Sequence, residues 1–198
     1  MRLAWPAAPG ASGTLNVVQE GSGKPWLTVR SLAAVPLTAP LRAGYSVTRS
    51  VTAVDPKAGA TTGATTTNAA GRWTRGDVLR VRLEVEAQSD MTWVVVSDPV
   101  PAGATILGAG GGRDSAIATR AEKRDSGYGN GAVPAFEERS FEAFRSYFEF
   151  MPRGKHVIEY TVRLNNPGRF SLPPTRVEAM YAPESFGELP NGAVEVAP

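Results

Sequence analysis

Apolar and polar residues alternate along several stretches of this chain. In 77–88 one set of alternate positions is apolar and the other is largely arginine and glutamate. A strand rises about 3.3 Å per residue and points side chains to opposite faces in turn, so this stretch predicts a strand with one buried face. Stretches 156–164 and 144–150 show the same period. Because 151–155, between the last two, contains Pro and Gly, we predict a hairpin there.

Other strands are predicted with a less regular pattern, at 26–32, 45–54, 91–97, 105–107, 175–181 and 193–196. Residues 91–96 are apolar on both faces, which suits a central strand covered on each side, and 98–103 contains two prolines typical of a rigid turn. Residues 137–148 hint at a helix, but from Phe144 on a strand is favoured. Short strands between Gly and Pro turns predict an all-β fold, an antiparallel β-sandwich with long loops and at most a short helix.

Composition agrees with a globular β protein. The 198 residues include 21 Gly and 16 Pro, and 42% are hydrophobic. A net charge of +2 disfavours a nucleic-acid partner. Zero cysteines exclude disulfides, thiolate metal sites and cysteine nucleophiles in this chain. The opening reaches Pro6 and Pro9 before a signal peptide's apolar region forms, so we expect a cytoplasmic protein or a piece of a longer one.

Long connections interrupt the strand pattern. Residues 56–71 are mostly Ala, Thr and Gly, and 108–134 begins with glycines and then becomes highly charged. Loops of this length inside a domain are usually functional or disordered. We therefore expect 108–134 to contact another domain or a partner, through the cationic side chains Arg113, Arg120, Lys123 and Arg124.

No enzyme motif is complete in the sequence. The glycines at 108–112 lack the Lys-Ser/Thr of a phosphate loop. Ser126 lacks the glycine two residues before it that a nucleophile elbow needs. His156 is the single histidine and shares an apolar stripe, so a multi-histidine metal site is excluded. We predict no enzymatic activity, no metal and no cofactor, with a hydrolase that uses Ser126 and His156 as a minor alternative.

Aromatic side chains are open to two interpretations. They could line a sugar or peptide groove, but on apolar strand faces they are more simply the sandwich core. We favour the core for the set Trp26, Trp93, Phe144, Phe148, Phe150, Tyr160 and Tyr181.

The C-terminal part of the chain carries a family resemblance. The resemblance is carried near the C-terminus by LNNPG at 164–168, LPPTRVEAMYAPE at 172–184 and FG at 186–187. Earlier segments match in the same order: GKPW at 23–26, SLAAVPL at 31–37, RGDV at 75–78, TWVVVSDPVPAG at 92–103 and EERSF at 137–141. In these segments the chain resembles the C-terminal end of bacterial alpha-2-macroglobulins. The departures fall mainly in 56–71 and 108–133.

The resemblance implies a domain of a much larger protein. Residues 43–198 would form a C-terminal macroglobulin-like β-sandwich, and 1–42 would be trailing strands of a preceding CUB-like domain. The larger protein would be a periplasmic or cell-envelope protease trap, a broad-spectrum endopeptidase inhibitor. Its C-terminal domain helps to hold a thioester-type domain before activation. This chain has no cysteine, so any Cys-x-Glu-Gln thioester would lie upstream or not exist.

Partners and residue roles follow from the resemblance as expectations. The partners would be other domains of the same polypeptide and, through the full-length protein, target proteases. Arg176 and Glu178 lie on one face of a predicted strand and could pair with a neighbouring strand or an adjacent domain. Tyr181, Pro183 and Phe186 are interpreted as anchors of the turn after that strand. The alternative is a stand-alone, adhesin-like or surface sandwich that binds protein or peptidoglycan.

Overall fold

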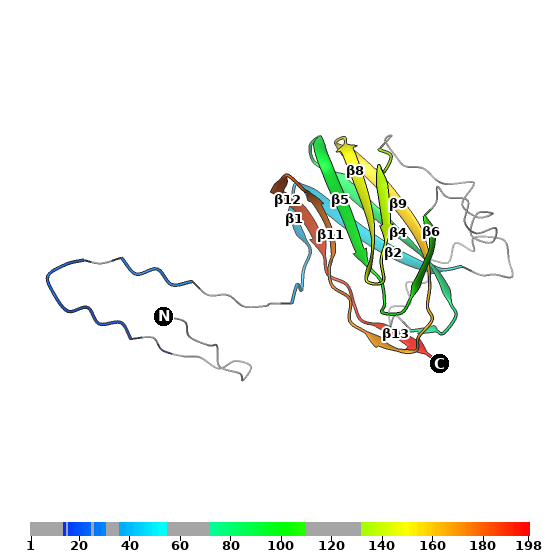
Figure 1. The fold of residues 1–198 in the computed structure, drawn as a ribbon, viewed down its shortest axis with the longest axis horizontal. Helices are drawn as coiled ribbons and strands as arrows, with labels where there is room; N and C mark the ends of the chain where they lie inside the picture. The colour runs from blue at the N-terminus through cyan, green and yellow to red at the C-terminus, as the bar shows by residue number, and fades with distance from the viewer. Residues whose placement is uncertain (1–13, 15, 25, 31–35, 55–71, 110–131) are drawn as a thin grey trace. The chain divides into compact units, whose positions relative to one another are not determined.

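A computed structural model describes residues 14, 16–24, 26–30, 36–54, 72–109 and 132–198. The chain divides into two units, residues 1–35 and residues 36–198. The second unit contains the strands (Figure 1), which are β1 (Leu41–Ala43), β2 (Tyr45–Ala53), β3 (Arg72–Thr74), β4 (Val78–Ala87), β5 (Met91–Pro99), β6 (Thr105–Ala109), β7 (Phe136–Arg139), β8 (Ala143–Met151), β9 (Gly154–Arg163), β10 (Gly168–Phe170), β11 (Thr175–Ala179), β12 (Ala182–Leu189) and β13 (Val194–Ala197).

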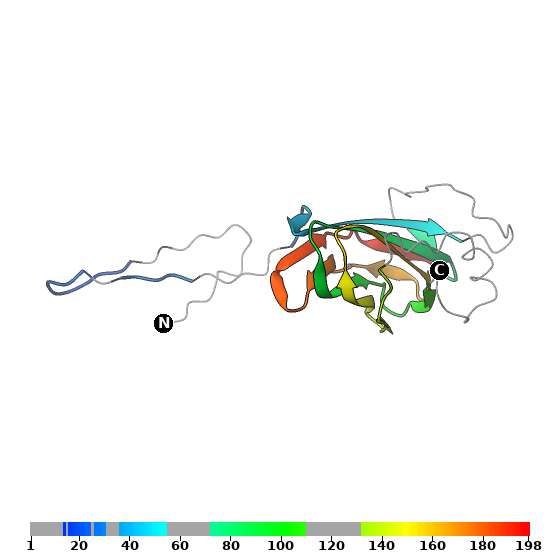
Figure 2. The same ribbon diagram turned by 90° about the horizontal axis from the view of Figure 1, so that it is seen from above.

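The strands form two packed sheets and a small third one. Sheet A has six strands in the order β1-β12-β11-β5-β8-β7, and sheet B has four in the order β2-β4-β9-β6. Figures 1 and 2 show sheets A and B as two layers. Pairing within both sheets is antiparallel, whereas in sheet C, of order β10-β13-β3, β13 runs parallel to β3. The antiparallel β-sandwich that the sequence predicts is confirmed.

Strand β4 shows how the period-two pattern builds the core. It pairs along its whole length with β2 on one side and β9 on the other. Its alternate apolar residues Leu79, Val81, Leu83 and Val85 face the core and are at most 4% exposed. On the opposite face Arg82 pairs across the strands with Glu159, Nη1 to Oε1, at 2.8 Å. Full burial of each apolar side chain stabilises the sandwich by about 1.5–3 kcal/mol.

The predicted hairpin at 151–155 is wrong. Strand β8 pairs with β5 and β7 in sheet A, and β9 pairs with β4 and β6 in sheet B. The short connection therefore crosses between the layers. As a result, Phe144 of β8 and Tyr160 of β9 stack face to face inside the core, with ring centroids 4.4 Å apart. The apolar stripes of β8 and β9 therefore face each other across the core.

Other expectations are also revised. Stretch 26–30 forms no strand, and each of its residues is exposed. Stretch 137–148 is β7 and β8 with a turn between them, and no helix occurs in the described part of the chain. No helix there is long and apolar enough to span a membrane. Strand β5 is central in sheet A as predicted, and its consecutive residues Val94, Val95 and Val96 are buried, whereas Trp93 is 46% exposed.

Candidate interaction site

The single histidine of the chain is buried in the core. His156 lies on the inner face of β9 and is 2% exposed, with its ring Nε2 2.7 Å from the carbonyl oxygen of Pro152. A buried ring held in this way is not available to activate a hydroxyl at the surface. Ser126, its proposed partner in a hydrolase, lies outside the described residues. Among the residues the structure describes, no group of three His, Cys, Asp or Glu side chains is arranged to hold a metal ion.

An exposed apolar cluster lies at one end of sheet A. It consists of Trp93, Met180 and Tyr181, which are 46%, 48% and 78% exposed, and we call it the aromatic patch. Trp93 and Tyr181 meet edge to face, with ring centroids 6.3 Å apart and an interplanar angle of 89°. The backbone N–H of Met180 donates to the carbonyl oxygen of Trp93 at 2.8 Å. The turn between β11 and β12 is thereby fixed beside β5.

The backbone of Trp93 is strained. Its φ is +53°, the left-handed region that glycine and asparagine tolerate best. For a bulky residue this conformation costs about 1–2 kcal/mol. The ladder between β5 and β8 pairs Thr92 with Phe150 and Val94 with Phe148, so Trp93 departs from regular pairing at one position. The indole of this residue lies beside Tyr181 and is 46% exposed, and strained residues of this kind concentrate at functional sites.

The environment of this patch differs from the one that the sequence predicts. The core placement expected for Trp93 and Tyr181 is wrong, because both rings are exposed. The role of Tyr181, Pro183 and Phe186 as turn anchors stays a prediction. Tyr181 and Pro183 are exposed, and Phe186 is partly buried beneath the Arg176 guanidinium, 5.0 Å from its carbon to the ring centroid. The available signal was the apolar alternation of β11, which ends at Ala179. Residues 180 and 181 therefore begin a turn and do not continue the strand.

A buried ion pair joins the two sheets farther along β5. The Asp98 carboxylate on β5 is 0% exposed and accepts the Arg49 Nε–H of β2, with both oxygens 3.0 Å from the nitrogen. It also accepts the hydroxyl of Tyr160 at 2.5 Å and the hydroxyl of Thr175. Asn191 Nδ2 donates to Thr175 Oγ1 at 3.0 Å, which extends the network to the segment before β13.

The electrostatics of this network follow from burial and charge. Burial first, and then the negative Asp98, raise the pKa of Tyr160 well above its usual value. Burial alone would lower the pKa of Arg49, but the Asp98 carboxylate outweighs it and raises that pKa. Arg49 therefore stays charged and Tyr160 stays neutral. The network acts as a fixed polar bridge across an otherwise apolar interface between the sheets.

The predicted contact residues divide into two groups. Arg113, Arg120, Lys123 and Arg124 lie outside the described residues. Arg176 and Glu178 lie on the outer face of β11 and pair with each other, Nε to Oε2, at 2.7 Å. Arg176 also pairs with Glu188 on the adjacent β12. Partial burial alone would lower the pKa of Arg176, but these two hydrogen bonds raise it.

A family model and a protein of known family both match this chain, and they agree with each other. Residues 44–184 match the family model described as the bacterial alpha-2-macroglobulin MG10 domain. An alpha-2-macroglobulin homolog from a Nostoc species is 29% identical over 113 residues, which are 57% of this chain and 6% of that protein. The chain thus spans a small part of the length of this relative.

Solved structures share the fold. Trypsin-activated alpha-2-macroglobulin from Escherichia coli superposes with a TM-score of 0.63 at 19% identity, covering 81% of this chain and 11% of that one. The native E. coli protein from domain MG7 to the C-terminus gives 0.62 at 18% identity, over 82% and 25%. Salmonella alpha-2-macroglobulin reacted with methylamine gives 0.60 at 18% identity, over 82% and 10%.

Proposed function

The chain belongs to the bacterial alpha-2-macroglobulin family, and we propose that it acts as a non-catalytic domain holding neighbouring domains of a longer, protease-trapping polypeptide in place. The observation that carries this proposal is the aromatic patch. Trp93, Met180 and Tyr181 expose apolar surface at one place, and the backbone of Trp93 is in the left-handed region, with a φ of +53°. Large apolar side chains grouped in solvent are typical of an interaction site.

The patch has the composition of an energetic hot spot. Trp and Tyr are enriched among the few residues that carry most of the binding free energy of an interface. Each such ring contributes about 1.5–3 kcal/mol when it is fully buried. Because Met180 is tied to Trp93 through the backbone and the rings are in contact, little conformational freedom remains to be lost on docking.

The larger role is proposed from the family. The relatives include an E. coli alpha-2-macroglobulin studied in a trypsin-activated form. We propose that the polypeptide containing this chain is a broad-spectrum endopeptidase inhibitor of the periplasm or cell envelope, where it protects the cell. Its protease targets would meet the full-length protein. Residues 1–198 alone are expected not to inhibit proteases, and stoichiometric inhibition by them would contradict the proposal.

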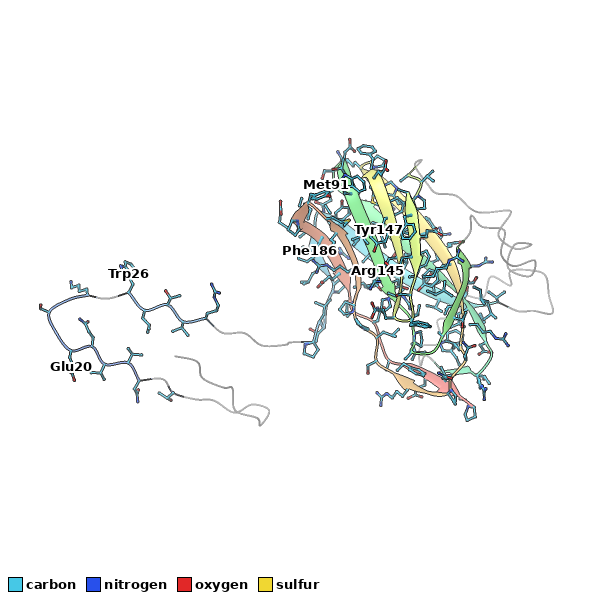
Figure 3. All side chains as sticks on the ribbon, viewed as in Figure 1. Glu20, Trp26, Met91, Arg145, Tyr147 and Phe186 are labelled. Atoms are coloured by element: carbon cyan, nitrogen blue, oxygen red, sulfur yellow. The ribbon has the colours of Figure 1, made fainter. Side chains whose placement is uncertain are left out.

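The N-terminal unit fits a position next to another domain. Its described residues are all exposed, including Val17 at 55%, Trp26 at 99%, Leu27 at 62% and Val29 at 68%. Figure 3 labels Trp26 in this unit. Burial of Trp26, Leu27 and Val29 would stabilise a folded contact by several kcal/mol. We propose that 1–42 contains strands of a preceding CUB-like domain that covers these side chains.

Substitution at the patch tests the proposal in the full-length polypeptide. Tyr181→Ser removes the most exposed patch ring, and Glu84→Ser removes a side chain that is 53% exposed on sheet B. Hydrogen exchange is expected to increase for Tyr181→Ser in β5 and in a segment outside 1–198, and to stay unchanged there for Glu84→Ser. Identical exchange in both variants and the parent protein would refute the role of the patch.

A further inference from the structure

We propose that the outer face of sheet A docks against a basic surface on another domain of the same polypeptide. The inference rests on the proposed function, because it extends the contact beyond the aromatic patch to the sheet beside it. We call this surface the sheet A face, and Figure 3 shows Arg145, Tyr147 and Phe186 on it. Its charged and aromatic members are Glu138, Glu142, Arg145, Tyr147, Glu149, Arg176, Glu178, Phe186 and Glu188.

Strand register brings these side chains together from distant parts of the chain. One row across the sheet runs from Arg176 through Ser97 to Arg145. The next row runs from Glu178 through Val95 to Tyr147. Residues two apart on a strand share a face, and directly opposite residues do so as well. The two rows therefore form one continuous surface across β11, β5 and β8.

Each arginine on this face is held between two carboxylates. Arg145 binds Glu138 through Nη1 at 2.9 Å and Glu142 through Nη2 at 2.8 Å. Arg176 binds Glu178 and Glu188. Both guanidinium charges are thus satisfied within the face, and each group of three retains one negative charge. Glu149, which is exposed and shares the parity of Arg145 on β8, adds another.

The face is consequently acidic, while the other sheet is nearly balanced. Its five glutamates against two arginines give a net charge of −3. The outer positions of β4 and β9 have a net charge of +1, from the residues Arg80, Arg82, Glu84, Glu86, Lys155, Glu159 and Arg163. The chain as a whole is +2. Of the two described sheet faces, the negative one is therefore that of the sheet that presents the aromatic patch, and charge complementarity favours a basic partner.

Rigid aromatic side chains distinguish this face from an ordinary solvated one. The Tyr147 hydroxyl donates to Glu138 at 2.8 Å, and its ring packs against Phe136 with centroids 5.8 Å apart. Arg176 lies over the Phe186 ring. Interfaces are enriched in Tyr, Phe and Arg, and side chains that are already fixed lose little entropy when a partner binds.

The occupant is assigned to the same polypeptide because most of a relative's length lies outside this chain. The matched region, 57% of this chain, is only 6% of the curated relative. Other domains are therefore available at high effective concentration. A basic domain surface seated on sheet A would bury the arginine and glutamate groups without leaving a charge unpaired.

Carboxylate labelling tests this inference. Carbodiimide with glycine ethyl ester modifies accessible carboxylates, which mass spectrometry locates by peptide. We expect Glu138, Glu142, Glu149 and Glu178 to react several-fold more slowly in the full-length polypeptide than in residues 1–198. The difference should vanish near 1 M salt, where the screening length falls to about 3 Å. Glu84, with a side chain 53% exposed on sheet B, is the control and should react equally in both.

The outcomes separate this inference from the proposed function. Equal labelling of the sheet A face in both proteins overturns the inference even if Trp93 and Tyr181 are protected from hydroxyl radicals. If these carboxylates stay protected from labelling at high salt, the surface that covers them is apolar, which refutes the assignment of a basic partner. Slower labelling of residues 1–198 with rising concentration indicates a second copy and overturns the assignment. The double variant Glu142→Gln and Glu149→Gln removes two exposed charges and should restore labelling of Glu138 in the full-length protein.

Discussion

An isosteric substitution of the buried Asp98 should lower the free energy of unfolding strongly. Asp98→Asn keeps the shape of the side chain but removes its charge. The carboxylate accepts from Arg49, Tyr160 and Thr175 through two oxygens and is 0% exposed. An asparagine offers one acceptor oxygen, and its NH₂ group would face donors. One of the two hydroxyls, of Tyr160 or of Thr175, then faces an NH₂ group in place of an acceptor, and Arg49 remains charged without an anionic partner.

The expected loss can be estimated from these contacts. The Arg49 side chain is 14% exposed, so water restores little of its solvation. Removing one partner of a buried ion pair costs about 3–5 kcal/mol. Domains are stable by about 5–15 kcal/mol in total, so a large part of the stability depends on this one group. For a chain of this size we expect the melting temperature to fall by about 10 °C.

Chemical denaturation followed by circular dichroism measures this change. Glu159→Gln is the control, because it removes an ion pair that is partly exposed to solvent, with Arg82 38% and Glu159 21% exposed. Such a pair is expected to contribute about 0–1 kcal/mol to stability. Adding Arg49→Met to Asp98→Asn should recover part of the stability, since the unpaired charge is gone. An Asp98→Asn variant within about 1 kcal/mol of the parent would refute the reasoning.

Three further predictions follow from packing and titration. Gly187→Ala should lower the free energy of unfolding by about 1–3 kcal/mol, because its Cβ would lie 2.8 Å from the backbone oxygen of Tyr45. The control Gly192→Ala, whose Cβ would have nothing within 4 Å, should leave the free energy of unfolding measured by chemical denaturation unchanged. Burial raises the pKa of Tyr45 to about 12 from 10.0, so the folded state binds this proton more tightly than the unfolded chain. Stability should therefore fall as pH rises from 10 to 12, and tyrosinate absorbance complete by pH 10 in the folded protein would contradict this. Trp93→Asn should fold with stability within about 1 kcal/mol of the parent in thermal denaturation, because asparagine tolerates a φ of +53°, and a larger loss would argue against backbone strain there.

The strands with a strict period of two could be predicted from the sequence. Stretch 77–88 became β4, 144–150 became β8, and 156–164 became most of β9. In each, one apolar face is buried, so the sequence contains the information that decides the strand. The partners of a strand depend on contacts across the core, which local sequence does not record. For this reason the crossing from β8 to β9 was predicted as a hairpin.

The candidate site was harder to predict because it depends on exposure and on distant contacts. An aromatic residue has the same sequence signal in a core as on a surface, so Tyr181 was placed in the wrong environment. The 98–103 stretch was predicted as a turn, whereas Asp98 lies in β5 and meets Arg49 from a strand 49 residues away. The roles of residues in 110–131 stay predictions, since they lie outside the described part of the chain.

Under the proposed function, another domain of a longer polypeptide covers the aromatic patch. The most direct test is hydroxyl-radical oxidation of Trp93 and Tyr181, measured by mass spectrometry in the polypeptide purified from its native source and in residues 1–198 alone. Both rings should be strongly protected in the native polypeptide and rapidly oxidised in the isolated chain. Equal oxidation in the two samples would contradict the proposed function and favour a sandwich that binds partners by itself.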